Sequence, residues 1–304
     1  MKKVLISLIL IGILLFTVLY RNEIVNYIII ITLFSNSYAS TPNEYMIEDN
    51  FLFVETTDKT IPYNRQDVLN IIYTNLNNGA DTISIICPSK YKECLDDTKN
   101  IFYDQSLLSN INNYVHPFNT YKMLEISTSD GLAQIEIGII KNYTETEIKD
   151  VNIMVDKIIA ENISSTMSDR EKIETIHNYI IKHTTFDSEK SDNIDNPNFI
   201  DKYKSGTAYG TLINNYAICA GYTDAMSIFL DRFGIVNYRV ASTDHIWNLV
   251  YLDNTWYHLD LTWDDQTVHN DTILKTYFLI TTKQLEEIND GVHKYNKAHF
   301  IEAS

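Results

Sequence analysis

Three residues in the second half of the chain, Cys219, His245 and Asp260, have the types and the order that covalent acyl chemistry requires. A cysteine supplies the nucleophile and a histidine supplies the base. A carboxylate on the other ring nitrogen fixes the histidine tautomer and stabilises the imidazolium. No other set of residues in the sequence combines these three roles as well. We therefore treat these three residues as candidate catalytic residues.

The position of Cys219 follows from the pattern of the residues after it. Residues 220–233 have the apolar spacing of a helix, and Gly234 is a natural helix stop. Cys219 would then lie at a helix N-terminus, where the helix dipole favours a thiolate and free backbone amides can receive an oxyanion. The alternative is a small buried cysteine that packs beside Ile218.

His245 and Asp260 are placed by three expected strands, at residues 235–242, 246–253 and 255–263. A two-residue turn at Asp253-Asn254 would pair position 245 with position 262. Asp260 would then share a sheet face with His245, within reach of its ring. A three-residue loop would move Asp260 to the other face. An aspartate inside an apolar strand needs a partner, for which His245 is the first candidate and His258 the reserve.

The residues before this region form two further groups. Residues 41–143, here called the N-terminal unit, alternate helix-like and strand-like patterns: helices at 65–77 and within 88–100, strands at 82–86, 123–127 and 132–140, and a turn at 130–131. They predict a small α+β unit with no catalytic residues of its own. A helix-rich stretch follows, with one helix at 145–162 and a second that begins at a capping box, Ser168 to Glu171.

Composition limits the classes of partner and cofactor. The 304 residues carry 40 acidic and 24 basic side chains, a formal net charge of −16, which argues against nucleic acid as a partner. There are three cysteines, and Cys87 and Cys94 are the expected disulfide partners, which leaves Cys219 as the odd thiol. The sequence has no Cys-x-x-Cys pair and no calcium loop of the EF-hand kind, so we predict neither a metal nor another cofactor.

Residues 1–39 form a separate segment. Lys2 and Lys3 precede an apolar run from Val4 to Leu19, and a second apolar stretch follows at residues 27–34. A positive start before an apolar run is typical of an export signal. We expect an uncleaved membrane anchor with the bulk of the chain outside the cytoplasm, and the alternative is a signal cleaved near Ala39, after which the protein would be secreted.

The region from about Ser168 to Asp265 resembles the transglutaminase-like superfamily in its bacterial, cell-surface branch. The resemblance is carried by five motifs: Ala208-Tyr209-Gly210-Thr211-Leu212, Cys219-Ala220-Gly221-Tyr222, Phe233-Gly234-Ile235, His245-Ile246-Trp247-Asn248, and Trp256 to Asp265. The one visible departure is Ile246, where the family often has alanine.

The resemblance implies a papain-like α+β core at residues 145–304, in which a helix bearing Cys219 packs on an antiparallel sheet bearing His245 and Asp260. It makes Cys219 the nucleophile, His245 the base and Asp260 the orienting carboxylate. Three aromatic residues would line the oxyanion or substrate pocket: Tyr209, Tyr222 and Trp247.

The resemblance does not fix the reaction. Its first implication is acyl transfer on protein or peptide amides through an acyl-enzyme. The alternatives are a cysteine peptidase or amidase acting on protein or cell-wall peptides, and an inactive wall-binding scaffold of the same fold. All three share the residues named above, so the sequence leaves them open.

Overall fold

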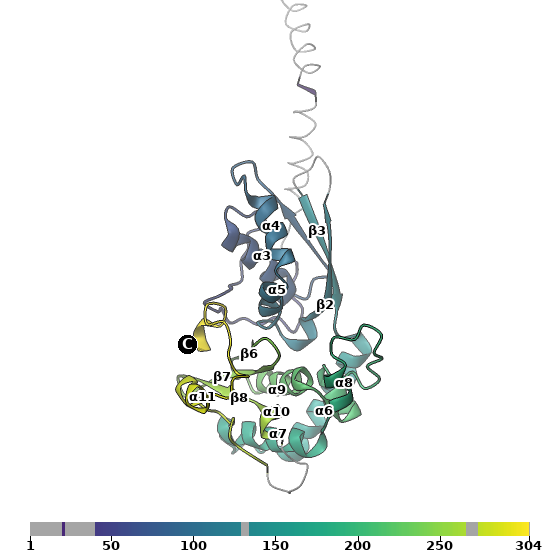
Figure 1. Cartoon of the computed structure of the whole chain (residues 1–304), viewed down its shortest axis with the longest axis vertical. Coiled ribbons are helices and arrows are strands. Elements are labelled where there is room, and N and C mark those ends of the chain that lie inside the picture. Colours follow the sequence, from purple (N-terminus) through teal and green to yellow (C-terminus); the bar gives the residue numbers. More distant parts are fainter. Residues whose placement is uncertain (1–19, 22–39, 129–133, 266–272, 304) are drawn as a thin grey trace, which may run out of the picture.

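The elements of the protein lie in two groups, one above the other, with the chain's last residues between them (Figure 1). The computed structural model describes residues 20–21, 40–128, 134–265 and 273–303. The upper group holds a three-stranded sheet and three helices, and the lower group holds a second three-stranded sheet and most of the other helices. Both sheets are antiparallel, so the predicted α+β class is confirmed.

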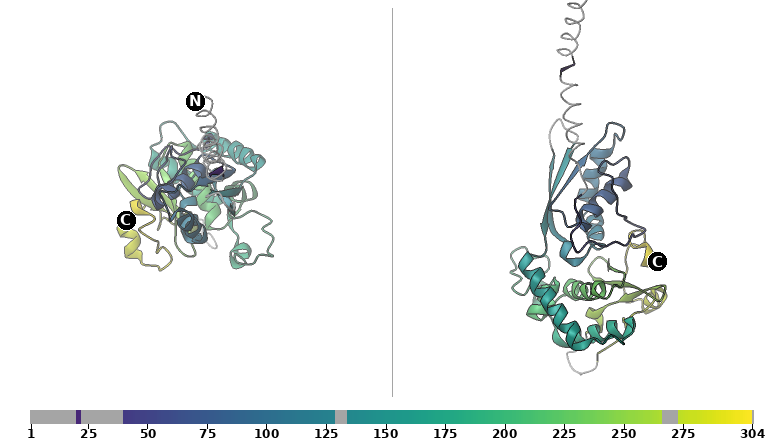
Figure 2. Two further views of the ribbon diagram at one scale, coloured as in Figure 1. Left: turned by 90° about the horizontal axis from the view of Figure 1, so that it is seen from above. Right: turned by 180° about the vertical axis from the view of Figure 1, so that it is seen from behind.

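The upper group corresponds to the N-terminal unit. Its sheet has the strand order β1-β3-β2, and its helices lie on one side of that sheet (Figure 2). In chain order the elements are α3 (Arg65–Asn77), β1 (Thr82–Ile86), α4 (Cys94–Tyr103), α5 (Gln105–Asn112), η1 (Pro117–Asn119), β2 (Tyr121–Thr128) and β3 (Gln134–Lys141). The bounds predicted for α3 and β1 are confirmed, α5 was not foreseen, and the turn expected at 130–131 lies outside the described residues.

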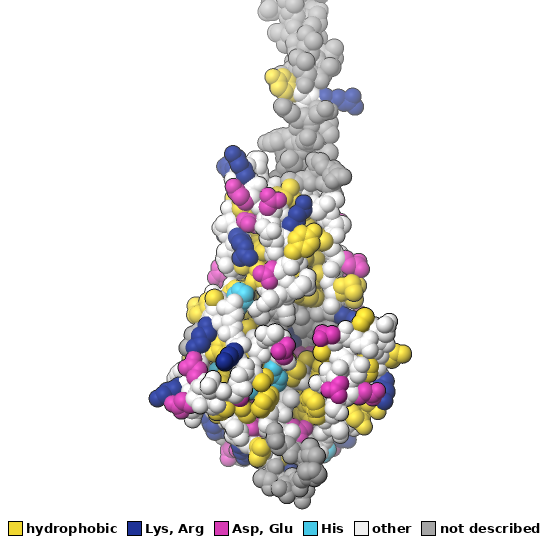
Figure 3. All heavy atoms as spheres, in the orientation of Figure 1, with side chains coloured by type: hydrophobic (Ala, Val, Ile, Leu, Met, Phe, Trp, Pro, Cys, Tyr) yellow, Lys and Arg dark blue, Asp and Glu magenta, His cyan; other side chains and the backbone are white. Residues whose placement is uncertain are grey.

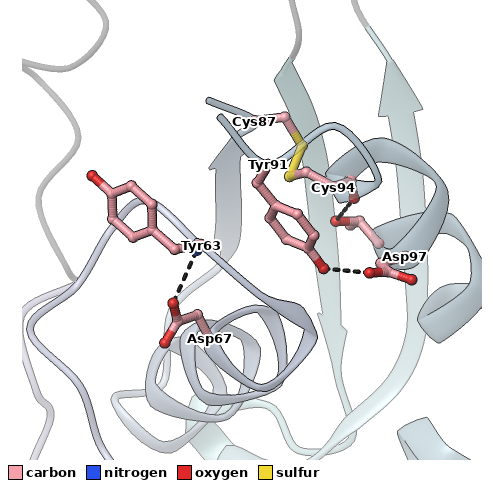
Figure 4. The surroundings of a disulfide bond; sticks show 7 residues. Tyr63, Asp67, Cys87, Tyr91, Cys94 and Asp97 are labelled. Carbon is pink, nitrogen blue, oxygen red and sulfur yellow. Dashed lines mark hydrogen bonds between the residues drawn. A yellow bond between two sulfur atoms is a disulfide. The ribbon is translucent and has the colours of Figure 1, made fainter. Parts of the chain in front are cut away.

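A disulfide joins Cys87, which follows β1, to Cys94 at the start of α4 (Figure 4). Beside it, the hydroxyl of Tyr91 donates a hydrogen bond to Asp97, which holds the short connection against the helix. The pairing confirms the prediction, and Cys219 is the free cysteine of the chain.

The lower group begins with two long helices, α6 (Glu145–Asn162) and α7 (Asp169–His183). Each opens with a complete capping box, Thr144 with Glu147 and Ser168 with Glu171, which satisfies backbone amides that a helix start leaves free. The remaining elements are β4 (Thr185–Phe186), α8 (Ser188–Asp192), the π-helical turn η2 (Gly210–Asn214), β5 (Tyr216–Ala217), α9 (Cys219–Arg232), β6 (Asn237–Ala241), β7 (Ile246–Leu252), β8 (Thr255–Leu259), α10 (Leu261–Asp264), α11 (Thr282–Ile288) and η3 (Ile301–Ala303).

The sheet β6-β7-β8 is buried on both faces. Along β7, Val250 and Leu252 belong to the core that contains α9, whereas Trp247 and Leu249 belong to the core of the N-terminal unit. Successive strand residues point to opposite faces, so β7 is packed from both sides. The helix bearing Cys219 therefore covers one face, and the N-terminal unit helps to cover the other.

The hairpin β7–β8 has the register that the sequence predicted. Leu252 pairs with Thr255 and Asn248 with Leu259. The two-residue turn uses Asp253 and Asn254, both with positive φ, 52° and 60°. Residues with positive φ at both turn positions match the twist of a tight hairpin, and Asp and Asn tolerate that conformation.

The third predicted strand, at 255–263, is wrong in its second half. Strand β8 ends at Leu259, and the chain turns into the short helix α10 at Leu261. Asp260 is therefore the N-cap of a helix and does not lie within the strand. An aspartate favours this position because its carboxylate accepts hydrogen bonds from the first amides of the helix.

The helices in the described ranges are too short or too polar to cross a membrane. The predicted anchor or signal at residues 1–39 falls outside those ranges apart from Tyr20 and Arg21. On the face shown in Figure 3, Lys and Arg side chains are scattered among acidic ones.

Candidate active site

Cys219 is the first residue of helix α9. The preceding residue, Ile218, donates its backbone N–H to the carbonyl of Ser205 at 2.9 Å, which fixes the start of the helix. The thiol is unpaired with other cysteines and partly exposed. The first amides of a helix have no partner within it, so Cys219 lies where an anion is stabilised.

Two motif glycines allow the close packing around this helix start. A Cβ atom on Gly221 would overlap the carbonyl oxygen of Ser205 and lie 2.8 Å from the hydroxyl oxygen of Thr211. A Cβ atom on Gly210 would overlap the carbonyl of Lys204. Both positions therefore require glycine because the backbone of residues 204–205 passes directly against them.

His245 lies immediately before strand β7 and is buried. Helix α9 is attached to this strand next to both candidate residues. The hydroxyl of Thr223, one turn after Cys219, contacts the carbonyls of Cys219 at 2.8 Å and of Ile246 at 3.0 Å. The side-chain amide of Asn248 donates to the carbonyl of Thr223 at 3.1 Å. These bonds hold the first turn of α9 against the start of β7.

Asp260 completes the arrangement. Its Oδ2 lies 2.5 Å from Nε2 of His245. Its Oδ1 accepts the backbone N–H groups of Thr262 at 2.8 Å and Trp263 at 3.2 Å, so the helix cap also orients the carboxylate. Because Nε2 faces Asp260, Nδ1 is the ring nitrogen left for the thiol of Cys219, and this thiol is among the groups that raise the pKa of His245.

The charges of this group reinforce one another. Burial lowers the pKa of His245, but the hydrogen bond and charge of Asp260, together with the contact with Cys219, outweigh it and raise that pKa to about 10. Burial raises the pKa of Asp260, but the hydrogen bonds and charges of His245 and His293 outweigh it and lower that pKa to about 2. The imidazolium and the carboxylate are therefore the favoured forms at neutral pH.

A second histidine, which the sequence analysis did not foresee, contacts the same carboxylate. Nε2 of His293 lies 2.9 Å from Oδ2 of Asp260, and its Nδ1 lies 2.7 Å from Oδ2 of Asp290. His293 follows helix α11 in a segment without strands or helices, so no periodic pattern marked it. The only signal in the sequence was the short spacing of Asp290 and His293.

His258, the reserve partner for Asp260, has another role. Its Nδ1 accepts the indole N–H of Trp247 at 2.9 Å, and its Nε2 faces the hydroxyl of Thr282 at 3.2 Å. Burial lowers the pKa of His258 to about 3, with a smaller contribution from the charge of His293. The ring is therefore neutral and holds Trp247 in place.

Two of the three predicted pocket aromatics are instead buried structural residues. Trp247 is 0% exposed and stacks on the ring of His245, with centroids 5.7 Å apart and an interplanar angle of 17°. Tyr222 is 1% exposed, and its hydroxyl donates to Asp265. Neither presents a surface to a substrate. Tyr209 is half-buried at the start of η2, where Lys204 lies over its ring.

The group His245, Asp260 and His293 also has the composition of a metal site. Among the described residues, the possible ligand atoms of these three lie within 4.8 Å of one another. However, the hydrogen bonds of Asp260 to both rings already account for this proximity. Those bonds give the three side chains a role that needs no metal. The absence of a metal at this site stays a prediction.

Comparisons with known proteins give a partial likeness in fold. No protein-family model matches the chain, and no curated protein matches its sequence. Among solved structures, the chain is similar to a TGase, with 17% identity and a TM-score of 0.36 over 51% of this chain and 47% of that one. It is also similar to a proposed cysteine protease from Cytophaga hutchinsonii, with 8% identity and a TM-score of 0.27 over 46% of this chain and 61% of that one. The matched part is thus less than two thirds of either protein.

Proposed function

We propose that this protein is a cysteine-dependent enzyme that transfers acyl groups from protein or peptide amides. The observation that carries the proposal is the hydrogen bond between His245 and Asp260 beside Cys219, which lies at a helix N-terminus and raises the pKa of the same imidazole. These are the parts that an activated thiol nucleophile needs.

The reaction would proceed through a thioester. The thiolate of Cys219 attacks the amide carbonyl, and amides at the start of α9 stabilise the oxyanion. His245 then gives its proton to the leaving amine or ammonia as the carbon–nitrogen bond breaks. An acceptor amine or water, deprotonated by His245, attacks the thioester and releases Cys219. Tyr209 is the remaining candidate for a substrate-pocket residue.

We further propose that the enzyme acts outside the cytoplasm, held to a membrane by residues 1–39. The basic and apolar pattern of that segment and the Cys87–Cys94 disulfide both support this location, because disulfides persist in oxidising compartments. Substrates would then be exported proteins or cell-wall peptides.

The test is to incubate the protein with a glutamine-bearing protein and a primary amine, and in parallel with wall peptides, and to follow masses. Addition of the amine with loss of ammonia identifies transfer, addition of water across an amide bond identifies hydrolysis, and both require Cys219. Cys219→Ala is the control. Equal product from this variant and the parent, or wall binding without any product, would contradict the proposal.

A further inference from the structure

Asp260 receives more hydrogen bonds than a carboxylate that orients one imidazole needs. Its Oδ2 is shared by Nε2 of His245 at 2.5 Å and Nε2 of His293 at 2.9 Å. The two rings are nearly perpendicular, with an interplanar angle of 85° and centroids 5.2 Å apart. The carboxylate is thus held from two directions in addition to the amides that its Oδ1 accepts.

His293 is itself rigidly held. Asp290 accepts a hydrogen bond from the backbone N–H of His293 at 3.1 Å and lies 2.7 Å from Nδ1 of the His293 ring. The short loop from 290 to 293 therefore binds both the backbone and the side chain of His293. Tyr277 stacks on the ring at a centroid distance of 4.7 Å and donates its hydroxyl to Asp290 at 2.8 Å. Trp247 packs against another side of the ring. A buried imidazole with both nitrogens engaged has one orientation.

The segment that carries His293 is also bound to the N-terminal unit. We call residues 289–303 the C-terminal strap. Asn110 lies 2.6 Å from Nδ1 of His299, and Tyr114 donates to the carbonyl of the same residue. Glu302 accepts the backbone N–H of Leu52 at 2.7 Å. Figure 2 shows the strap's end beside the upper group of elements. The strap therefore links the N-terminal unit to Asp260.

We propose that His293 is a positioning residue of the active site, which acts through Asp260 on His245. This inference rests on the proposed function, because the position of His245 matters only if His245 serves Cys219. Asp260 can reorient only if it breaks bonds on both of its oxygens, so the hydrogen bond to His245 keeps one geometry. Nδ1 of His245 is thereby kept directed toward the thiol of Cys219. The N-terminal unit contributes to the site because it fixes the strap that carries His293.

The experiment compares two substitutions of the same residue in the full chain. His293→Gln keeps a nitrogen donor at the distance of Nε2, whereas His293→Leu removes every donor. The first measurement is the alkylation rate of Cys219 by iodoacetamide across pH. We expect His293→Leu to reduce the rate at neutral pH on the order of 10- to 100-fold and to alter the pH profile, and His293→Gln to stay near the parent. Lys297→Leu is the matched control, because it removes a polar side chain of the strap whose ion pair is with Glu286 on α11.

The second measurement is the low-field proton NMR signal of the hydrogen-bonded N–H of His245. We expect this signal in the parent, His293→Gln and Lys297→Leu, and its loss by exchange in His293→Leu. Equal signals in the Leu and Gln variants would overturn the inference. A parent thiol that alkylates like free cysteine would instead overturn the proposed function, and the NMR comparison would still decide the role of His293.

Discussion

Arg239 on strand β6 and Asp224 on helix α9 form a buried ion pair, with Nη1 and Oδ1 2.6 Å apart and side chains 5% and 8% exposed. The guanidinium also donates to the carbonyls of Asn112 at 2.5 Å and Val115 at 3.0 Å, at the end of α5. Burial raises the pKa of Asp224 although Arg239 and Tyr143 oppose the change. One side chain therefore joins the helix of Cys219 to the N-terminal unit.

Replacement of Arg239 should be severely destabilising. Arg239→Met leaves the buried charge of Asp224 without its cationic partner, so that among the described residues only the Tyr143 hydroxyl still donates to it, and leaves two backbone carbonyls without the guanidinium. We therefore expect the free energy of unfolding to fall by about 3–5 kcal/mol. Urea denaturation followed by circular dichroism measures it. Arg232→Met is the control, because the Arg232–Asp156 pair is exposed and should contribute less than about 1 kcal/mol. Equal losses in both variants would show that burial of the pair does not matter.

Gly221→Ala should displace the candidate nucleophile and weaken the packing at the start of α9. The new methyl group would overlap the carbonyl of Ser205, which is the group that fixes the helix start through Ile218. We expect alkylation of Cys219 to slow by about 10-fold or more, since small displacements at a reacting atom are costly. The matched control is Gly234→Ala at the far end of α9, where nothing lies within 4 Å of the new Cβ but positive φ is strained, so it loses stability without moving Cys219. Unchanged alkylation in Gly221→Ala would mean that the helix start tolerates the shift.

Asp260→Asn should separate catalysis from folding. The Asn side chain still caps α10, so we expect the fold to remain. Its amide cannot stabilise the imidazolium of His245, and acyl-enzyme formation should drop on the order of 10³- to 10⁴-fold. Single-turnover mass spectrometry of the acyl-enzyme measures this loss. Asp244→Asn, an exposed carboxylate next to His245, controls for net charge, and a similar loss in that variant would argue against a specific role for Asp260.

Stability should depend on pH through the same groups. The pKa of Asp260 is lowered to about 2, so its contribution is present above about pH 4 and is lost as pH falls toward 2. The pKa of His245 is raised to about 10, so its contribution is complete below about pH 6.5 and is lost as pH rises through 10. We expect the free energy of unfolding, measured by urea titration at each pH, to fall at both limits. Asp260→Asn should reduce the pH dependence of stability at both the acidic and the alkaline end. An unchanged pH dependence in that variant would assign it to other groups.

The sequence was sufficient for the parts of the site that local patterns determine. The tight turn at Asp253 and Asn254 fixed the hairpin register, and Gly234 marked the end of the helix that begins at Cys219. It failed at Asp260, because a strand residue and a helix cap look alike in an apolar run, and only the backbone direction after Leu259 distinguishes them. Whether Asp260 is a strand residue or a helix cap, its carboxylate lies close to His245.

The remaining errors come from tertiary packing. His293 is 33 residues from Asp260 and lies in an irregular segment, so nothing local connects the two. Tyr222 and Trp247 were assigned to a pocket through the family resemblance, and an aromatic side chain suits a core as well as a binding surface. Their burial depends on how α9 and the N-terminal unit cover the sheet, which spacing along the chain does not encode.

The strap also imposes an order in time. A chain emerging from the ribosome or a translocation channel presents Cys219, His245 and Asp260 before it presents His293. In its place the strap contacts Asn110 and Leu52, which are synthesised much earlier. If His293 positions the site, a nascent chain carries its thiol, base and carboxylate without full activity, and the enzyme matures only when late residues close onto early ones.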